Sequence, residues 1–191
     1  MSMVERLAGA ILRFRYGELI NIIERVVSII KIARDDYVQH MSTLYTRVDS
    51  SVIRNKIRSA LISAGIDADS VDLILLDSSY YIPTHEQFKI LTEFIRDDFM
   101  SYYKDVFDSD DYSLVFKAEM QAIALLNNVA FVTGTLVQPD GSRVKYSWNI
   151  VLLKDDDIIR VYTYEPRTNT LAWSIQASID GKKYTPEFIL M

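Results

Sequence analysis

The pattern of apolar residues changes near residue 129, and this change constrains the fold more than any other feature of the sequence. Before it, apolar residues recur at three- and four-residue steps, which is typical of amphipathic helices. After it come four runs rich in β-branched and aromatic residues, at 130–138, 144–153, 158–164 and 170–179. The order predicts an α+β fold, in which N-terminal helices are followed by a helix packed on an antiparallel meander sheet.

The same patterns place the elements and the domains. Helices are expected at 4–44, as one long helix or as two shorter ones, and at 52–64, 85–103 and 112–127. The apolar run 71–76 reads equally as a buried strand or as the end of a helix. We expect an N-terminal helical extension over residues 1–70 and an α+β core over residues 71–191, together forming one compact unit.

The first long helix carries an apolar stripe that suits either of two roles. Its members fall on one helical face: Leu19, Ile22, Ile23, Val26, Ile29, Ile30 and Ala33. The stripe either packs on the protein's own core or pairs with a second copy, which would make a homo-oligomer.

Composition excludes several classes of protein. The chain has no cysteine, so disulfides, thiolate catalysis and cysteine-rich zinc sites are ruled out, and its two histidines, His40 and His85, are too few for a histidine metal site. We therefore expect no metal and no cofactor. The net charge of −5 argues against a nucleic-acid partner.

The N-terminal region shows neither a signal peptide nor a membrane span. Charged residues such as Arg13, Glu18 and Arg25 interrupt every apolar stretch before about 20 residues accumulate. We expect a cytoplasmic or virion-associated protein.

Three polar motifs follow one another in an informative order. The first is Asp108-Ser109-Asp110-Asp111-Tyr112-Ser113, at the predicted start of a helix. Tyr146-Ser147-Trp148-Asn149 lies on the second predicted strand, and Glu165-Pro166-Arg167-Thr168 ends the third. With these motifs, residues 80–191 resemble small phage, archaeal-virus and prokaryotic proteins with a papain-like or transglutaminase-like cysteine-peptidase core.

The resemblance implies a remnant triad without catalytic power. It puts Ser109 at the position of the cysteine and Tyr146 at that of the histidine, and it keeps the acid as Glu165. A serine needs a general base to act as a nucleophile, and a neutral phenol does not supply one. The predicted function is therefore a non-catalytic domain acting in protein interaction or assembly, a pseudoenzyme of viral or mobile-element origin.

Two alternatives remain open for the same residues. One is a residual hydrolase or acyl transferase that uses Ser109. The other is a glycan- or peptide-binding module that uses the old cleft, with Trp148, Asn149 and Tyr164 as ligand-binding residues beside Tyr146.

The acidic turn at the first motif also has two interpretations. Asp108, Asp110 and Asp111 are expected to cap the helix, since carboxylates satisfy free N–H groups and the positive end of the helix dipole. A calcium loop is the rival, although Tyr112 and Ser113 do not fit its ligand and glycine positions.

Overall fold

A computed structural model describes residues 20–21, 23–29, 43–95 and 108–191 of the chain. By its internal contacts the chain divides into two units, Met1–Met41 and Ser42–Met191. Helix α2 (Ser50–Ser63) belongs to the second unit, and its buried residues Ile53, Ile57 and Leu61 contribute to the core. This helix was expected in the N-terminal extension.

The second unit is mostly β-sheet. Its described residues contain two further helices, α3 (His85–Ile95) and α4 (Ser109–Ile123), and nine strands. The strands are β1 (Thr46–Asp49), β2 (Asp72–Ile74), β3 (Ser79–Ile82), β4 (Val129–Val137), β5 (Arg143–Asp155), β6 (Ile158–Glu165), β7 (Thr170–Trp173), β8 (Ser178–Ile179) and β9 (Lys182–Leu190).

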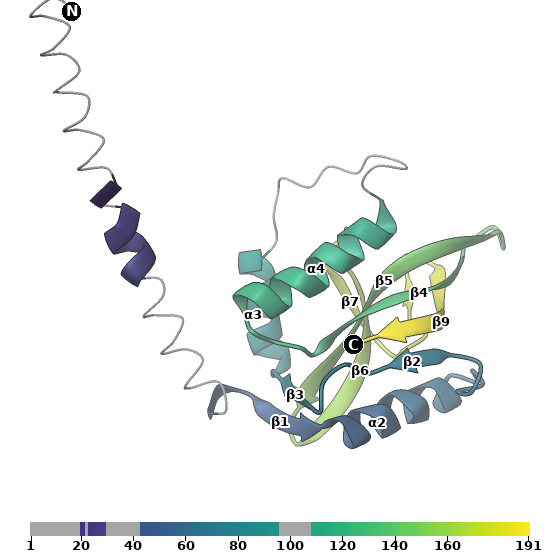
Figure 1. Cartoon of the computed structure of the whole chain (residues 1–191). Coiled ribbons are helices and arrows are strands. Elements are labelled where there is room, and N and C mark those ends of the chain that lie inside the picture. The colour runs from purple at the N-terminus through teal and green to yellow at the C-terminus, as the bar shows by residue number, and fades with distance from the viewer. Residues whose placement is uncertain (1–19, 22, 30–42, 96–107) are drawn as a thin grey trace, which may run out of the picture. The chain divides into compact units, whose positions relative to one another are not determined.

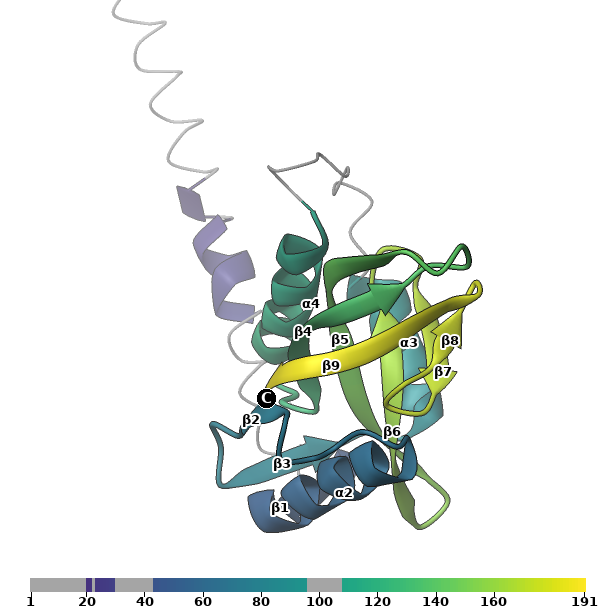
Figure 2. The same ribbon diagram turned by 90° about the vertical axis from the view of Figure 1, so that its right-hand side faces the viewer.

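The last strand lies inside the main sheet. The strand order is β2-β9-β4-β5-β6-β7, with β8 paired to β9, and β1 and β3 form a separate two-stranded sheet. Strands β4 to β7 are joined as an antiparallel meander, whereas β9 pairs antiparallel with β4 and parallel with β2. Figure 2 shows β9 crossing the sheet beside β4.

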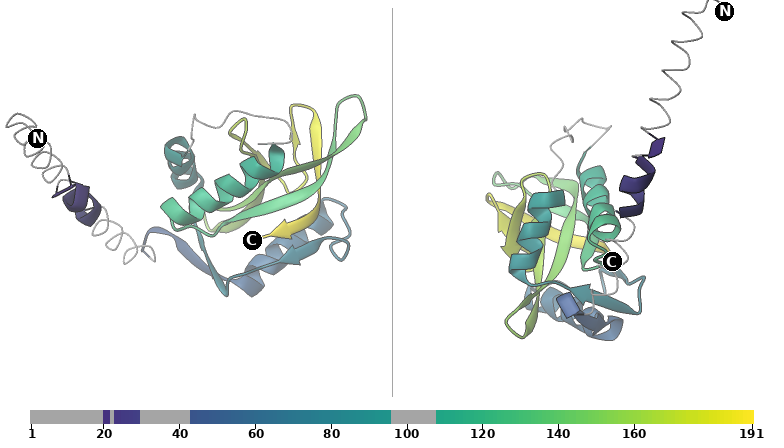
Figure 3. Two further views of the ribbon diagram at one scale, coloured as in Figure 1. Left: turned by 45° about the horizontal axis from the view of Figure 1, so that its top comes forward. Right: turned by 90° about the vertical axis from the view of Figure 1, so that its left-hand side faces the viewer.

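Both faces of the main sheet are covered. Helices α3 and α4 contribute Phe88, Phe116 and Met120 to one apolar cluster, which also contains Val151 and Leu153 of β5. Helix α2 contributes to the other cluster, which holds the alternate residues of β5: Trp148, Ile150 and Leu152. Adjacent residues of a strand point to opposite faces, so β5 serves both clusters. The views in Figures 1 and 3 show α2 and α4 on different sides of the strands.

The predicted architecture, helices first and a plain meander afterwards, is wrong in its topology. Strands β1, β2 and β3 precede residue 129, and the run 71–76, left open between strand and helix, contains β2. Strand β2 pairs with β9, which lies more than a hundred residues away along the chain. Apolar periodicity identifies a strand but not its partner, which is why the meander pattern hid the central place of β9.

The first unit is described over a short helical stretch. Ile23, Val26 and Ile29 are exposed there, by 52%, 48% and 65%. The rest of the apolar stripe, together with most of the helix predicted at 4–44, falls outside the described residues. Across the described segments, no helix combines the length and the apolar character that crossing a bilayer requires.

Candidate ligand-binding cleft

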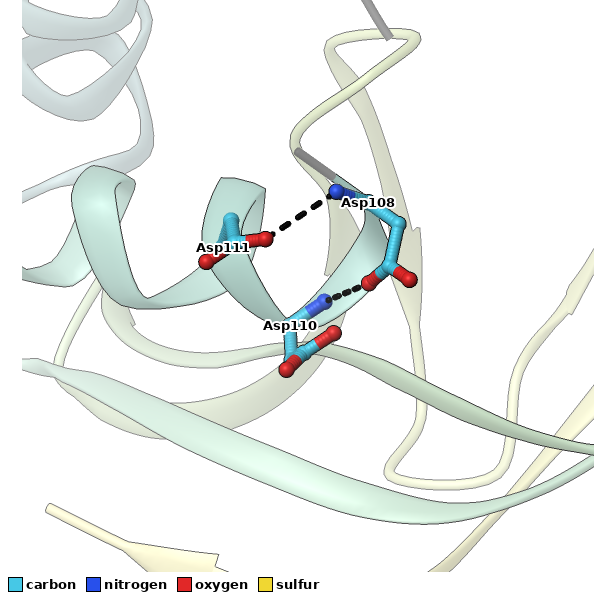
Figure 4. A group of neighbouring side chains, drawn as sticks. All are labelled: Asp108, Asp110 and Asp111. Atoms are coloured by element: carbon cyan, nitrogen blue, oxygen red, sulfur yellow. Dashed lines mark hydrogen bonds between the residues drawn. The ribbon is translucent and has the colours of Figure 1, made fainter. Parts of the chain in front are cut away.

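The acidic turn caps helix α4. The Asp108 side chain accepts a hydrogen bond from the backbone N–H of Asp110, and the Asp108 N–H donates to the Asp111 carboxylate at 3.1 Å. Figure 4 shows this reciprocal arrangement, a capping box that satisfies free N–H groups of the first turn. The carboxylates of Asp108, Asp110 and Asp111 lie within 4.8 Å of one another. The hydrogen bond that a protonated Asp110 makes to the Asp108 carboxylate, then partial burial and the like charges of Asp108 and Asp111, raise the pKa of Asp110.

Ser109, the first residue of α4, lies against strand β5. Its Oγ accepts a hydrogen bond from the backbone N–H of Ser147 at 3.3 Å. That N–H is available because β6 pairs with β5 only from Asn149 onward, so residues 143–148 pair with β4 alone among the described strands. The start of α4 therefore lies where β5 extends past β6.

A β-bulge shapes the neighbouring part of the sheet. Thr133 of β4 pairs with Phe188, but the next residue, Gly134, pairs with Pro186, so Glu187 is the extra residue on β9. A Cβ at position 134 would lie 2.2 Å from the Thr185 carbonyl oxygen, so only glycine fits there. Bulges redirect side chains. Here Glu187 accepts a hydrogen bond from Thr135 at 2.7 Å and forms an ion pair with Lys145 of β5.

These groups line a cleft of about 460 Å³ at the N-terminus of α4. Its lining residues are Asp108, Ser109, Asp110, Phe131, Thr133, Gly134, Lys145, Tyr146, Ser147 and Glu187. The lining is mainly polar and carries both signs of charge. A hydrogen bond from Lys145, and a smaller effect of one from Thr135, lower the pKa of Glu187. Its carboxylate is therefore ionised at neutral pH.

A tyrosine–glutamate cluster lies beside the cleft. The Glu165 carboxylate is 4% exposed and accepts hydrogen bonds from the Tyr184 hydroxyl at 3.0 Å and from the Arg167 N–H at 3.2 Å. The Arg167 guanidinium donates to the Tyr146 hydroxyl at 3.5 Å. Burial, followed by the nearby Glu165 carboxylate, raises the pKa of both Tyr146 and Tyr184. Both phenols are therefore neutral donors over the physiological range.

The three remnant-triad positions thus lie near one another, but they do not form a relay. Ser109 and Tyr146 line the same cleft, and Tyr146 is next to Glu165. The hydrogen bond of the Ser109 hydroxyl, however, runs to the Ser147 backbone. His85 lies elsewhere, 3.9 Å from the Asp155 carboxylate and edge-on to the Tyr162 ring. Among the residues that line the cleft in the described part of the chain, none is a histidine.

The three residues expected to hold a ligand are buried. Trp148 and Asn149 are 0% exposed and Tyr164 is 3% exposed. Trp148 packs against the Tyr184 ring, Asn149 donates to the Ser113 carbonyl, and Tyr164 packs on Phe116. These side chains support the sheet and α4 from within, and none of them lines the cleft.

Sequence reasoning missed Lys145, Thr133 and Glu187, which do line it. The available signal was Pro186 inside a β-rich run, because proline in a strand indicates an edge or a bulge. The partner of that bulge lies some fifty residues earlier, where the sequence offers only a glycine.

Comparison with known proteins gives structural neighbours only. No family model and no curated protein matches the sequence. The solved structure of the PSL1a-E64 complex superposes with a TM-score of 0.56 at 15% identity, covering 76% of this chain and 51% of that one. A Polyporus squamosus lectin bound to the human-type influenza-binding epitope Neu5Aca2-6Galb1-4GlcNAc gives a TM-score of 0.46 at 15% identity, over 72% and 48% of the two chains. The chain spans about half the length of the solved chains it matches.

These findings correct the prediction of a papain-like or transglutaminase-like core. The described chain is mostly β-sheet and shares its fold with PSL1a, and no family model of a papain-like or transglutaminase-like protein matches it. The short motifs did not identify the family, because a capped helix beside two strands is a local arrangement that occurs in many unrelated folds. The predicted function, that of a non-catalytic papain-like domain, is therefore wrong as well. The suggested relationship to phage and archaeal-virus proteins stays a prediction.

Proposed function

We propose that this domain is a glycan-binding module and that the cleft at the N-terminus of α4 holds the sugar. The observation that carries the proposal is the bulge at Glu187, which directs a carboxylate into a cleft that already contains an ammonium group and several hydroxyls.

The lining suits a hydroxyl-rich ligand. Sugars present hydroxyls that donate and accept at once, so they need donors and acceptors side by side. Glu187 offers acceptor oxygens, Lys145 offers donors, and Thr133 can do either. The ion pair holds the first two in place before the ligand arrives, which reduces the cost of ordering them.

The volume of the cleft and the aromatic residue in its lining suit the binding of a short oligosaccharide. A volume of about 460 Å³ lies within the range of roughly 300–1,000 Å³ that is usual for small-molecule sites. Phe131 lines the cleft and is 9% exposed, so it offers a small apolar surface to the C–H face of a sugar ring. The sialylated glycan bound to the Polyporus squamosus lectin is that protein's ligand, and its superposition is too weak to carry the argument.

A glycan array followed by calorimetry tests the proposal. The wild-type chain should bind a subset of neutral or acidic oligosaccharides, and Glu187→Gln and Lys145→Met should each weaken that binding by about tenfold or more, as expected for loss of a charge-assisted hydrogen bond. Asp157→Asn is the matched control, because Asp157 is fully exposed on the turn after β5 and does not line the cleft. Absence of binding across the array, or equal losses in Asp157→Asn, would reject the glycan assignment.

A peptide ligand is the second candidate, favoured by the part of β5, residues 143–148, that pairs with β4 alone among the described strands. Backbone groups two residues apart on a strand face the same way, so the N–H of Lys145 faces the edge to which the Ser147 N–H points. An extended peptide could add a strand there. Binding of unstructured peptides that resists Glu187→Gln would favour this candidate over a glycan.

We also propose that the N-terminal helix mediates self-association. The support is the exposure of Ile23, Val26 and Ile29, three apolar side chains at three-residue steps along one side of the helix. Large exposed apolar surfaces are characteristic of interaction sites.

A further inference from the structure

A second cavity, remote in sequence from the α4 cleft, lies between helix α2 and strands β6 and β7. It measures about 440 Å³ and includes Ala60 and Ala64 of α2 and Val161 of β6 in its wall. Helix α2 packs directly on β6, as Figure 2 shows. The small side chains of Ala60 and Ala64 leave the room that a larger residue would fill.

Trp173 at the end of β7 lines this cavity and is 69% exposed. A tryptophan exposed beside a cavity offers a ligand a large apolar surface and an N–H donor. The Arg160 guanidinium lies 5.4 Å from the centre of its ring, and the Arg160 Nε is held 3.4 Å from the Asp155 carboxylate. The guanidinium therefore lies beside the indole ring in the cavity lining.

The lining contains two basic side chains, one of which, Arg160, is also paired with Asp155. Lys56 and Arg160 both line the cavity, and its described lining residues include no carboxylate. The remaining wall is apolar, with Ile159 and Ile175 beside Val161. An occupant that matches this wall has an apolar body and one anionic group.

We propose that this cavity binds a small amphipathic anion, an apolar chain or ring carrying a single carboxylate. Its apolar part packs on Trp173 and between Ala60 and Val161. Its carboxylate accepts hydrogen bonds from Lys56 and Arg160, which are charge-assisted and therefore stronger than neutral ones. This site is independent of the glycan-binding cleft, since the two share no lining residue.

Intrinsic fluorescence of the full chain tests the proposal, because the chain has only two tryptophans and Trp148 is 0% exposed. Sodium octanoate is the probe and 1-octanol its neutral match. We expect saturable changes in Trp173 emission with octanoate, at a dissociation constant of about 1 mM or tighter, and binding of octanol about tenfold weaker.

Variants of the lining residues, with a control on the same helix as Lys56, make the test specific. Lys56→Gln and Arg160→Gln should each weaken octanoate binding by about tenfold, whereas Arg58→Gln, on α2 but outside the cavity lining, should leave it unchanged. Trp173→Leu should also weaken octanoate binding, which calorimetry measures for this variant. Because Trp173 is exposed, the substitution should preserve the fold. Equal affinity for octanoate and octanol, or an effect of Arg58→Gln as large as that of Lys56→Gln, would overturn the proposal, as would the absence of a saturable signal.

Discussion

At the scale of single residues, the most constrained group is the buried Glu165 carboxylate. It is held by the Tyr184 hydroxyl and the Arg167 N–H, and Tyr146 lies next to it. A buried carboxylate is tolerated only when donors compensate for lost water. Each donor around Glu165 therefore contributes to folding, whatever ligand the neighbouring cleft binds.

The two tyrosines of this cluster, together with Tyr162 elsewhere in the sheet, predict a loss of stability at alkaline pH. Burial raises the pKa of Tyr184 and Tyr146 above the usual value of about 10, and burial followed by Asp155 raises the pKa of Tyr162 to about 12. A group whose pKa is higher in the folded than in the unfolded state makes its full contribution to stability at pH values below the unfolded-state pKa. That stabilisation is lost as pH rises above about 10. Guanidinium unfolding midpoints should therefore be level from pH 7 to 9 and fall above about pH 10.

Tyr184→Phe separates two effects of the Tyr184 hydroxyl on stability, its hydrogen bond to Glu165 and its ionisation at high pH. At pH 7 the variant should be less stable by about 1–3 kcal/mol, because Glu165 loses a donor. Above about pH 10 its midpoint should fall less steeply than that of the wild type, since one ionising phenol is gone. Parallel curves for Tyr184→Phe and wild type would contradict the assignment.

At the scale of elements, helix α4 depends on its capping box. Asp108→Ala removes the side chain that accepts the Asp110 N–H and should lower the free energy of unfolding by about 0.5–2 kcal/mol. Asp110→Asn should leave the free energy of unfolding unchanged or raise it slightly. The raised pKa of Asp110 means that the fold disfavours its charged form, and asparagine removes that charge. Thermal denaturation measures both. A loss in Asp110→Asn equal to that in Asp108→Ala would mean that Asp110 has a stabilising role, such as binding a cation.

The N-terminal helix carries a separate prediction. Ile23→Lys with Val26→Lys should lower the mass measured by light scattering and leave the thermal midpoint of residues 42–191 unchanged, because the charges oppose burial in a paired seam. Ile62→Lys is the control, since Ile62 is 64% exposed on α2. A wild-type mass with a lowered midpoint would place the stripe in the protein's own core.

At the scale of the whole molecule, the central position of β9 makes the C-terminal residues essential. Strand β9 joins β2 to β4, and Tyr184 and Ile189 are fully buried members of the core. Deleting residues 182–191 should abolish cooperative unfolding in circular dichroism, because the cut divides the sheet in its interior. Deleting residues 1–41 should preserve it, since residues 42–191 form a compact unit. Loss of folding in the N-terminal deletion would show that the first unit completes the core.

The sequence by itself determined the local elements whose signals lie within a few residues. Asp108 caps a helix, the β-rich runs after residue 129 form strands, and the helix expected at 52–64 forms at Ser50–Ser63. These features depend on backbone hydrogen bonds and side-chain alternation between near neighbours, which a sequence displays directly.

Only the tertiary structure decided the strand order, the burial of Trp148, Asn149 and Tyr164, and the cleft. Apolar and aromatic residues look alike in sequence whether they face a core or a ligand, so the residues chosen for binding proved to be packing residues. The groups that do line the cleft, Lys145 and Glu187, meet because β9 pairs with β4 through a bulge opposite Gly134. Pairing between distant strands is selected by the packing of the whole sheet, and no local pattern encodes it.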